Sequence, residues 1–462
     1  MMSTQMRALF SAKEIKILLM IALPLVITGF IEASVGFTST LMVAHLSHYE
    51  LAALGLVSSL FATLMVVIWG TLGATSILIS QHHGANNVAA VARVYLDSMI
   101  LAIILSIPAM IILWNISPIL LLFGQPPQIV SLTKSYLHAL SFAMIPDFTG
   151  IILLQFVLGL GHTRINLLFS LMWVPCTIVA NYVFIYGKWG IPAFGIAGIG
   201  WGTAVSFWFT LFFMGGYLYL NPTYRPYLRK NAAQGQPSQM KELLRVGMPL
   251  GGMFCIEVTF FMVLALLMGH ISMEQLAANQ IALQFVSQFT VASFSLAQAI
   301  TVRMGHTIGA QDYHAAKRAG YLGIMLGLIY MSVIAIIYWL FPTLLISIDL
   351  KVHDAVNQNL IHYVKQFLVL AALFQLFEIL RITAFGALRA LRDTKFTMLI
   401  SSVMFWGIAL PSGYLFAFIL HWQGNGLWLG MVFGAVVGAT ILIARFKNKI
   451  ATYCNLEDRV KL

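Results

Sequence analysis

The stretch GMPLGGMFCIEVTFFMVLALLMGHISMEQLAANQIALQFVSQ, residues 247–288, decides how this chain is organised. It contains an apolar run longer than the roughly 20 residues that cross a bilayer as a helix. One carboxylate, Glu257, lies inside that run. A charged side chain at such a depth costs at least ~2.5–3.5 kcal/mol unless it is protonated, paired or hydrated. We therefore expect a membrane-spanning helix that carries a functional acid.

The same pattern occurs near the start of the chain, as ALPLVITGFIEASVGFTSTLMVAHLSHYELAALGLVSSL at residues 22–60. The offset in residue number from Glu32 to Glu257 equals that from His45 to His270, so the two stretches align without a gap. An ungapped match of this length indicates an internal duplication, and it predicts one buried carboxylate at the same depth in each copy.

The duplication continues beyond these segments. Gly84-Ala85 and Gly309-Ala310 are separated by the same offset as the two glutamates. Farther on, aligning GHTR with RDTK lengthens the offset slightly and places Asp147 opposite Glu378. Two repeat-related pairs of acids, Glu32 with Glu257 and Asp147 with Glu378, therefore fall inside apolar segments.

The composition excludes an ordinary soluble domain. Hydrophobic residues make up 60% of the 462 residues and charged residues 9%, and the mean hydropathy is +0.89. Apolar segments of membrane-spanning length recur between short polar turns, as in a polytopic helical membrane protein. The three cysteines lack disulfide or metal spacing, and His82-His83 is interpreted as part of a solvated loop.

The segments predict twelve spans in an all-α fold: 16–43, 51–80, 93–117, 131–160, 166–188, 195–219, 243–270, 277–305, 319–347, 358–388, 396–420 and 425–445. We expect a first lobe of six helices at 1–219, a linker at 220–242, and a second lobe of six helices with a short tail at 243–462. Six spans are an even number, so both copies insert with the same orientation, as parallel repeats.

The positions of the basic residues predict the orientation. Twenty-one of the 26 lysines and arginines fall at one end of the spans; Arg381 lies within a span, and the other end holds Lys134, Lys188, Lys351 and Lys365. The positive-inside rule makes the basic end, with both termini, cytoplasmic. The net charge of +11 thus reflects the orientation of the chain in the membrane. We expect the lipid bilayer, but no nucleic acid, as a partner.

Several stretches resemble the multidrug and toxic compound extrusion (MATE) transporters of the NorM-type branch. They are PLGGMFCIEVTFF, AANQIALQF, AITVRMGHTIGAQD, FQLFEILRITAFGALRALRDT and NYVFIYGKWGIPAFGIAGIGWGTA. The resemblance runs from about Leu18 to the end of the twelfth span. It implies two lobes around a central cleft, and export of cationic or amphipathic compounds in exchange for inward Na⁺ or H⁺.

The resemblance also implies roles for single residues. Glu257 and Glu378 match the acidic positions that couple transport to cations in the second lobe, and they are the candidates for holding Na⁺. The first lobe departs from the pattern, because Ser39 stands where the family usually has an aspartate. Glu32, seven residues earlier on the same helix face, and Asp147 are the candidate substitutes.

Simpler structural roles compete with these assignments. Arg381 follows Glu378 at the spacing of a same-face helical pair, so the two could form a permanent ion pair. Asp147 follows Pro146, and it could stabilise a kinked helix or help to bind an ion at carbonyls that the kink exposes. An acid in a low-dielectric site favours its neutral form, so an arriving proton or cation competes there with a cationic substrate.

A polar stripe marks the eighth span. Gln280, Gln284 and Gln288 recur every four residues, with Asn279 beside them. Such side chains must face protein or water and not lipid, so they either line the cleft or join helices. Asn181, in the fifth span, has the same two interpretations.

No phosphate-binding G-x-x-x-x-G-K-[ST] motif occurs, so ion gradients are expected to drive transport. The prediction is a monomeric secondary antiporter of the plasma (inner) membrane, without a cofactor and not an enzyme. The alternative within the same architecture is a flippase for lipid-linked precursors. An intramembrane hydrolase is less favoured, because it needs a catalytic pair of acids and gives no reason for a whole-chain duplication. A passive channel is disfavoured, because the acids differ between the two copies and form no obvious ring.

Overall fold

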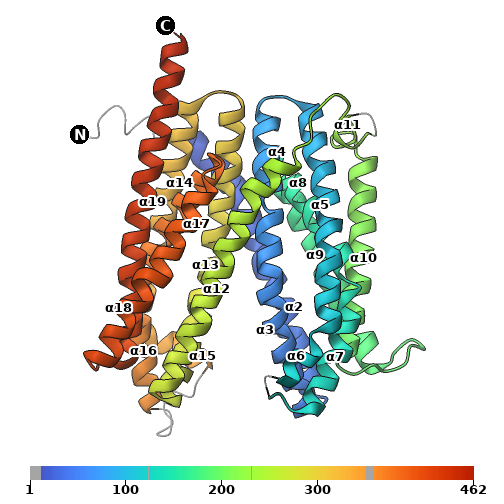
Figure 1. Cartoon of the computed structure of the whole chain (residues 1–462), viewed down its shortest axis with the longest axis vertical. Helices are drawn as coiled ribbons and strands as arrows, with labels where there is room; N and C mark the ends of the chain where they lie inside the picture. The colour runs from blue at the N-terminus through green and yellow to red at the C-terminus, as the bar shows by residue number, and fades with distance from the viewer. Residues whose placement is uncertain (1–11, 123, 230–231, 350–357, 462) are drawn as a thin grey trace. The chain divides into compact units, whose positions relative to one another are not determined.

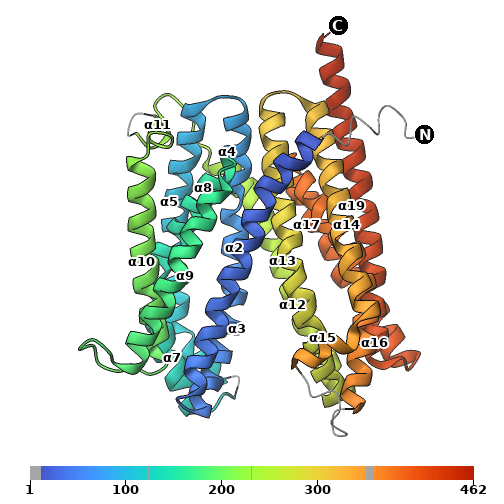
Figure 2. The ribbon, with the colours of Figure 1, turned by 180° about the vertical axis from the view of Figure 1, so that it is seen from behind.

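The computed structural model describes residues 12–122, 124–229, 232–349 and 358–461, and every regular element in these ranges is helical. The helices form two compact units, shown in Figures 1 and 2. Unit 1 comprises Met1–Val26 and Gly252–Leu462, and unit 2 comprises Ile27–Gly251. The division predicted from the sequence stays a prediction. The compact units differ from it because α2 (Ala12–Ala44) and α12 (Met240–Ile271) each run from one unit into the other.

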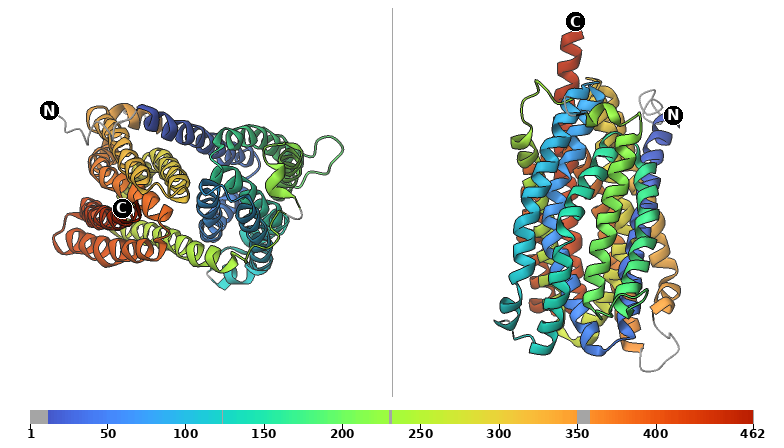
Figure 3. Two further views of the ribbon diagram at one scale, coloured as in Figure 1. Left: turned by 90° about the horizontal axis from the view of Figure 1, so that it is seen from above. Right: turned by 90° about the vertical axis from the view of Figure 1, so that its right-hand side faces the viewer.

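Within unit 2, the helices between α2 and α12 pack side by side, as the end-on view of Figure 3 shows. They are α3 (His48–Leu72), α4 (Ala74–Gly84), α5 (Val88–Asn115), α6 (Ser117–Leu122), α7 (Pro127–Ser141), α8 (Met144–Gly159), α9 (Thr163–Tyr186), α10 (Ala197–Leu220) and α11 (Arg225–Leu228).

The elements of unit 1 after α12 are α13 (Met273–Gly309), α14 (Tyr313–Leu340), α15 (Pro342–Asp349), α16 (Gln358–Ala390), α17 (Thr394–Ser402), the π-helical η2 (Val403–Ala409), α18 (Leu410–Tyr414), the π-helical η3 (Leu415–Ile419) and α19 (Gln423–Lys461). The last of these extends beyond its neighbours in unit 1, toward the C-terminus (Figure 1).

The described helices confirm the predicted set of spans. Eleven are long and apolar enough to cross a membrane, or twelve if α7 and α8, bent by 51°, form one broken span. The predicted end of the ninth span at residue 347 is wrong, since α14 ends at Leu340. Pro342 has no N–H to continue that helix, and the residue before a proline avoids helical geometry. Accordingly, Phe341 has φ −126° and ψ 39°.

The duplication is visible in the helix caps. Ser47 and Ser272, at equivalent positions of the two copies, accept hydrogen bonds from backbone N–H groups three residues on, at 3.2 and 3.1 Å. Asn87 and Asp312 are equivalent in the same register and cap α5 and α14 in the same way, at 2.9 and 2.8 Å. A cap side chain satisfies an N–H that the first helical turn leaves free. The repeat thus extends from sequence to local geometry.

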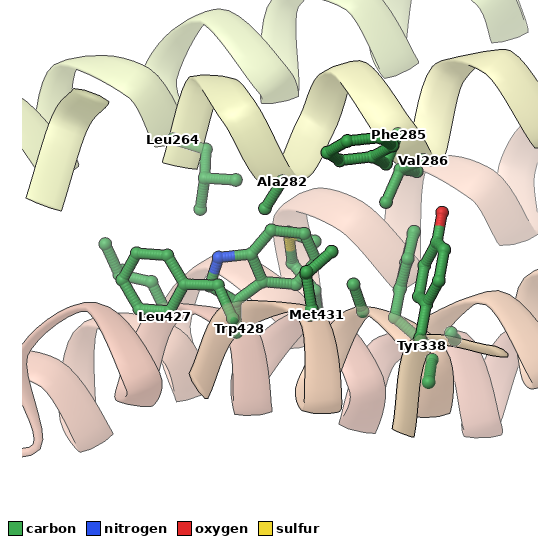
Figure 4. Close-up of a cluster of buried hydrophobic side chains, with 14 of the residues drawn as sticks. Leu264, Ala282, Phe285, Val286, Tyr338, Leu427, Trp428 and Met431 are labelled. Carbon is green, nitrogen blue, oxygen red and sulfur yellow. The ribbon is translucent and has the colours of Figure 1, made fainter. Parts of the chain in front are cut away.

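Aromatic side chains dominate the core of unit 1. Phe260 on α12 and Phe405 on η2 have ring centroids 4.9 Å apart, and both are fully buried. Figure 4 shows Trp428 of α19 among side chains from α12 and α13, including Leu264 and Ala282. Helices in a bilayer associate through close packing of this kind, because lipid tails are as apolar as the side chains. The core therefore holds α12, α13 and α19 together.

A polar anchor fixes the start of α12 within unit 2. Asp97 on α5 is buried, and its Oδ2 accepts hydrogen bonds from Ser238 Oγ at 3.0 Å and Gln239 N at 2.6 Å. Arg93, one turn earlier, pairs with the same carboxylate at 3.0 Å. The end of the predicted linker therefore lies against the start of α5. Sequence reasoning missed Asp97, although its four-residue spacing from Arg93 was a usable signal.

Candidate functional site

Two helices bring three ionisable side chains together inside unit 1. α12 carries Glu257, and α16 carries Glu378 and Arg381, one turn apart. α16 is the most buried of the candidate spans, with 67% of its most apolar window inside the protein. A three-residue separation puts Glu378 and Arg381 on one helix face, which is turned toward α12.

Arg381 bridges the two carboxylates. Its Nε donates to Glu378 Oε2 at 2.8 Å, and its Nη2 donates both to Glu378 Oε1 and, at 3.3 Å, to Glu257 Oε2. The guanidinium also lies over the ring of Phe405, 5.3 Å from its centroid. The ion pair considered from the sequence therefore exists, and it includes Glu257 as a third member. We call these three residues the unit 1 trio.

The unit 1 trio is unequal in exposure and unbalanced in charge. The Arg381 side chain is 1% exposed and that of Glu378 is 6% exposed, but that of Glu257 reaches 13%. Glu257 is thus the most accessible member of the unit 1 trio. With both acids ionised, two negative charges face one positive charge, and the net charge is −1. An excess charge held in a protein interior strongly favours uptake of one proton or one monovalent cation.

The polar residues of α13 divide between two faces of that helix. Asn279 is fully buried, and neither its Nδ2 nor its Oδ1 has a hydrogen-bond partner within the described ranges. Gln280, Gln284 and Gln288 are exposed. The predicted stripe is therefore a surface feature of α13, whereas Asn279 faces the core of unit 1.

Unit 2 contains the other two predicted acids. Glu32 on α2 accepts a hydrogen bond from Ser170 Oγ of α9 at 2.7 Å. Asp147 on α8 is buried and accepts one from Trp69 Nε1 of α3 at 3.4 Å. No arginine or lysine pairs with either acid among the residues that the structure describes.

Ser39, at the position where the resemblance calls for an acid, is bonded to a second predicted residue. Asn181 Nδ2 of α9 donates to Ser39 Oγ at 3.3 Å, and both side chains are buried. Asn181 Oδ1 is left without a protein partner among the described residues. A Cβ on Gly202 of α10 would lie 2.7 Å from Asn181 N, so that glycine lets α10 approach α9 closely.

The carboxyl groups of the two units therefore have different hydrogen-bond partners. The acids of unit 1 share a guanidinium, while those of unit 2 have one neutral hydrogen-bond donor each. Of the two carboxylates of unit 2, Asp147 is buried and Glu32 is half-buried, and the described residues give neither of them a cationic partner. Sequence reasoning found all four acids and Arg381. It missed Ser170 and Trp69, because nothing in the sequence marks which hydroxyl or indole a distant acid will reach.

The fold is that of known transporters. The chain superimposes on a crystal structure titled MATE in the bent conformation, with a TM-score of 0.86, 18% identity, and coverage of 99% of both chains. It also superimposes on the eukaryotic MATE transporter AtDTX14, with a TM-score of 0.81, 20% identity, and coverage of 96% of this chain and 99% of that one. At such identities the likeness establishes the architecture, a two-unit polytopic membrane protein.

The family follows from the sequence matches. The family model MatE matches residues 24–183 and 249–415. A protein of Mesorhizobium japonicum, named as a probable multidrug resistance protein NorM, is 34% identical over 440 residues, covering 95% of this chain and 94% of its own length. The chain belongs to the MatE family. It is therefore an integral membrane protein and not an enzyme, which excludes the intramembrane hydrolase considered from the sequence.

Proposed function

We propose that this chain is a secondary antiporter that exports cationic or amphipathic drugs in exchange for inward Na⁺ or H⁺. The observation that carries the proposal is that two carboxylates, Glu257 and Glu378, share one guanidinium in a chain whose relatives are named as multidrug resistance proteins. With both acids ionised, the unit 1 trio has a net charge of −1. One excess negative charge can be satisfied by one proton, one Na⁺ or one cationic substrate. Exchange then needs only that these occupants exclude one another.

The exchanging ions bind first at Glu257. Its side chain is the most exposed of the unit 1 trio, and it is bound to Arg381 less tightly than Glu378 is. A cation that reaches Glu257 competes with Arg381 Nη2, which keeps its bonds to Glu378. Arg381 thus prevents both acids from being fully neutralised by protons when the site is empty. Release of the inward-moving ion returns the carboxylate for the next substrate.

Ion gradients supply the energy. A potential of 100 mV is worth ~2.3 kcal/mol for each net charge that crosses the membrane, or roughly 50-fold in accumulation. Swapping one proton for one monovalent cation moves no net charge, so that exchange would draw on the pH difference alone. We further propose that the chain is a monomer in the bacterial inner membrane. The distribution of lysine and arginine supports a cytoplasmic location for both termini. The mechanism uses no cofactor.

A flippase for lipid-linked precursors fits the site less well. Such a substrate carries phosphate and would require uncompensated positive charge inside the spans. Arg381 is the basic residue that the sequence analysis places within a span, and two carboxylates already bind it. The unit 1 trio attracts cations and repels phosphate.

The proposal is tested by efflux of a cationic dye from proteoliposomes under separately imposed Na⁺ and pH gradients. We expect one of the two gradients to drive efflux in the wild-type protein, and Glu257→Gln to reduce that efflux to the level without a gradient. Glu274→Gln, which neutralises an exposed acid at the start of α13, is the matched control and should transport normally.

Correct folding of each variant in detergent is checked by size-exclusion chromatography before reconstitution. Gradient-driven efflux in Glu257→Gln equal to that of the wild-type protein would overturn the coupling assignment. Loss of efflux in Glu274→Gln as well would show that the assay responds to any change of charge.

A further inference from the structure

A pocket of about 490 Å³ opens in unit 2 where α5 ends and α6 and α7 begin. It lies at the opposite end of α5 from Arg93 and Asp97, which hold the linker, and α6 and α7 likewise lie far from α11 in Figure 1. Because α5 is a candidate span that ends at Asn115, we expect this pocket to lie at the depth of the lipid headgroups.

One wall of the pocket is a stacked pair of rings. Trp114 and His138 lie with ring centroids 4.0 Å apart and planes 4° from parallel. His138 Nε2 donates to the carbonyl oxygen of Trp114 at 3.0 Å, which fixes the imidazole in this position. The pair thus places an indole at the end of a candidate span, where tryptophan is enriched in membrane proteins.

The remaining lining is suited to an anion. Lys134 lines the pocket, and no carboxylate pairs with it in the part of the chain that the structure describes. Ser117 also lines it, 8% exposed, and its Oγ has no hydrogen-bond partner within unit 2 as described. A buried hydroxyl without a partner costs about 1–3 kcal/mol. Ser131 adds a second hydroxyl, and no Asp or Glu is among the described lining residues.

Exposed apolar side chains of α6 lie beside the pocket. Ile119 and Leu121 of α6 are each 50% exposed, and Leu122 is 88% exposed. A free phosphate ion makes no apolar contacts, whereas the acyl chains of a lipid would cover these exposed side chains. Apolar residues beside a cationic pocket at headgroup depth match an amphipathic anion.

We propose that this pocket binds the phosphate of an anionic phospholipid headgroup. Lys134 supplies the charge, Ser117 and Ser131 donate hydrogen bonds to the phosphate oxygens, and the Trp114–His138 pair covers the glycerol. The acyl chains lie along the exposed residues of α6. Because the lining lacks a carboxylate for an ammonium group, an anionic headgroup binds in preference to phosphatidylethanolamine.

Native mass spectrometry of the purified full-length protein tests this site. Phosphatidylglycerol is titrated into the wild-type protein, Lys134→Gln, Lys134→Arg and Lys188→Gln. The last variant removes a lysine that is predicted at the same end of the spans, and it is the matched control. We expect roughly fivefold weaker binding of one lipid in Lys134→Gln, on the basis of the usual contribution of a lysine near an anionic membrane surface, and wild-type binding in the other two variants.

Three further probes separate the sources of phosphate. A diacylglycerol with a neutral sugar headgroup, phosphatidylethanolamine and inorganic phosphate should each compete weakly with phosphatidylglycerol. Equal binding of either lipid would overturn the assignment of an anionic headgroup, and strong competition by inorganic phosphate would reduce the pocket to a small-anion site. Unchanged lipid binding in Lys134→Gln would overturn the proposal as a whole. Because the readout is lipid binding, it is independent of transport.

Discussion

Arg381 sets the charge of the carboxylate site in unit 1. It donates to both Glu257 and Glu378 and is itself almost fully buried. Removing one partner of a buried ion pair typically costs about 3–5 kcal/mol, since a charge is left uncompensated. In this trio an acid is already in excess, so losing one acid leaves a neutral pair and losing the arginine leaves two negative charges. The outcome of a substitution therefore follows from the net charge.

Restoring that charge should restore coupling. Glu378→Gln leaves Arg381 paired with Glu257 and a net charge of zero, so we expect gradient-driven dye efflux to be lost. Combining Glu378→Gln with Arg381→Met leaves Glu257 alone, again with a charge of −1, and should recover a substantial part of the efflux. Arg381→Met by itself should lower the unfolding temperature in detergent more than the double variant does. A double variant as inactive as Glu378→Gln would contradict the charge argument.

At the scale of elements, glycines determine how α19 packs in unit 1. Gly426, Gly430, Gly434 and Gly438 recur every four residues and therefore lie on one face. A Cβ on Gly430 would lie 2.6 Å from the carbonyl oxygen of Ala409. A Cβ on Gly434 would lie 2.8 Å from the Cβ of Ala409. Small residues at this spacing let two helix backbones approach closely in a membrane. This stripe positions α19 against η2, α18 and η3.

Enlarging a residue in this stripe should destabilise unit 1. The side chain of Gly430→Leu would meet backbone atoms, which cannot move aside as a flexible side chain can. Overpacking of a tight contact costs about 1–3 kcal/mol or more, so we expect the unfolding temperature in detergent to fall by several degrees. Gly407→Leu is the control, since a Cβ there meets only Val403 Cγ1, at 3.7 Å. Equal effects of the two substitutions would refute the role of the stripe.

At the scale of the whole molecule, two helices join the units. The boundary crosses α2 between Val26 and Ile27 and α12 between Gly251 and Gly252. Both helices carry an internal proline just before it, Pro24 in α2 and Pro249 in α12. A proline within a helix removes one backbone hydrogen bond and makes bending easier. The two prolines stand at equivalent positions of the two copies, and we expect them to let the helices bend.

Replacing both prolines should slow transport without unfolding the protein. Alanine restores the helical N–H and is ~3 kcal/mol more favourable than proline in a helix interior. Pro24→Ala combined with Pro249→Ala should therefore reduce the rate of dye efflux several-fold at an unchanged or higher unfolding temperature. Pro108→Ala is the control, because Pro108 lies inside α5 of unit 2, away from the boundary. A comparable slowing by the control substitution would argue against a hinge at the boundary.

Much of the fold could be predicted because its signals are local. Apolar length sets the spans, and the internal repeat marks equivalent positions such as the caps Ser47 and Ser272. The predicted end of the ninth span was wrong because a single residue, Pro342, overrides the apolar pattern at the end of α14. The pocket beside Lys134 gave no sequence signal, since its lining comes from three helices whose approach is a matter of packing.

The sequence by itself determined that Glu32, Asp147, Glu257 and Glu378 lie in apolar spans, because a carboxylate in an apolar run is visible without knowing its neighbours. Only the tertiary structure decided what those acids contact. Arg381 and Glu257 are far apart in the sequence, as are Ser170 and Glu32, yet each pair is joined by a hydrogen bond. Helix packing selects such partners from many equally apolar alternatives. It leaves the acids of unit 1 sharing a guanidinium and those of unit 2 with neutral donors.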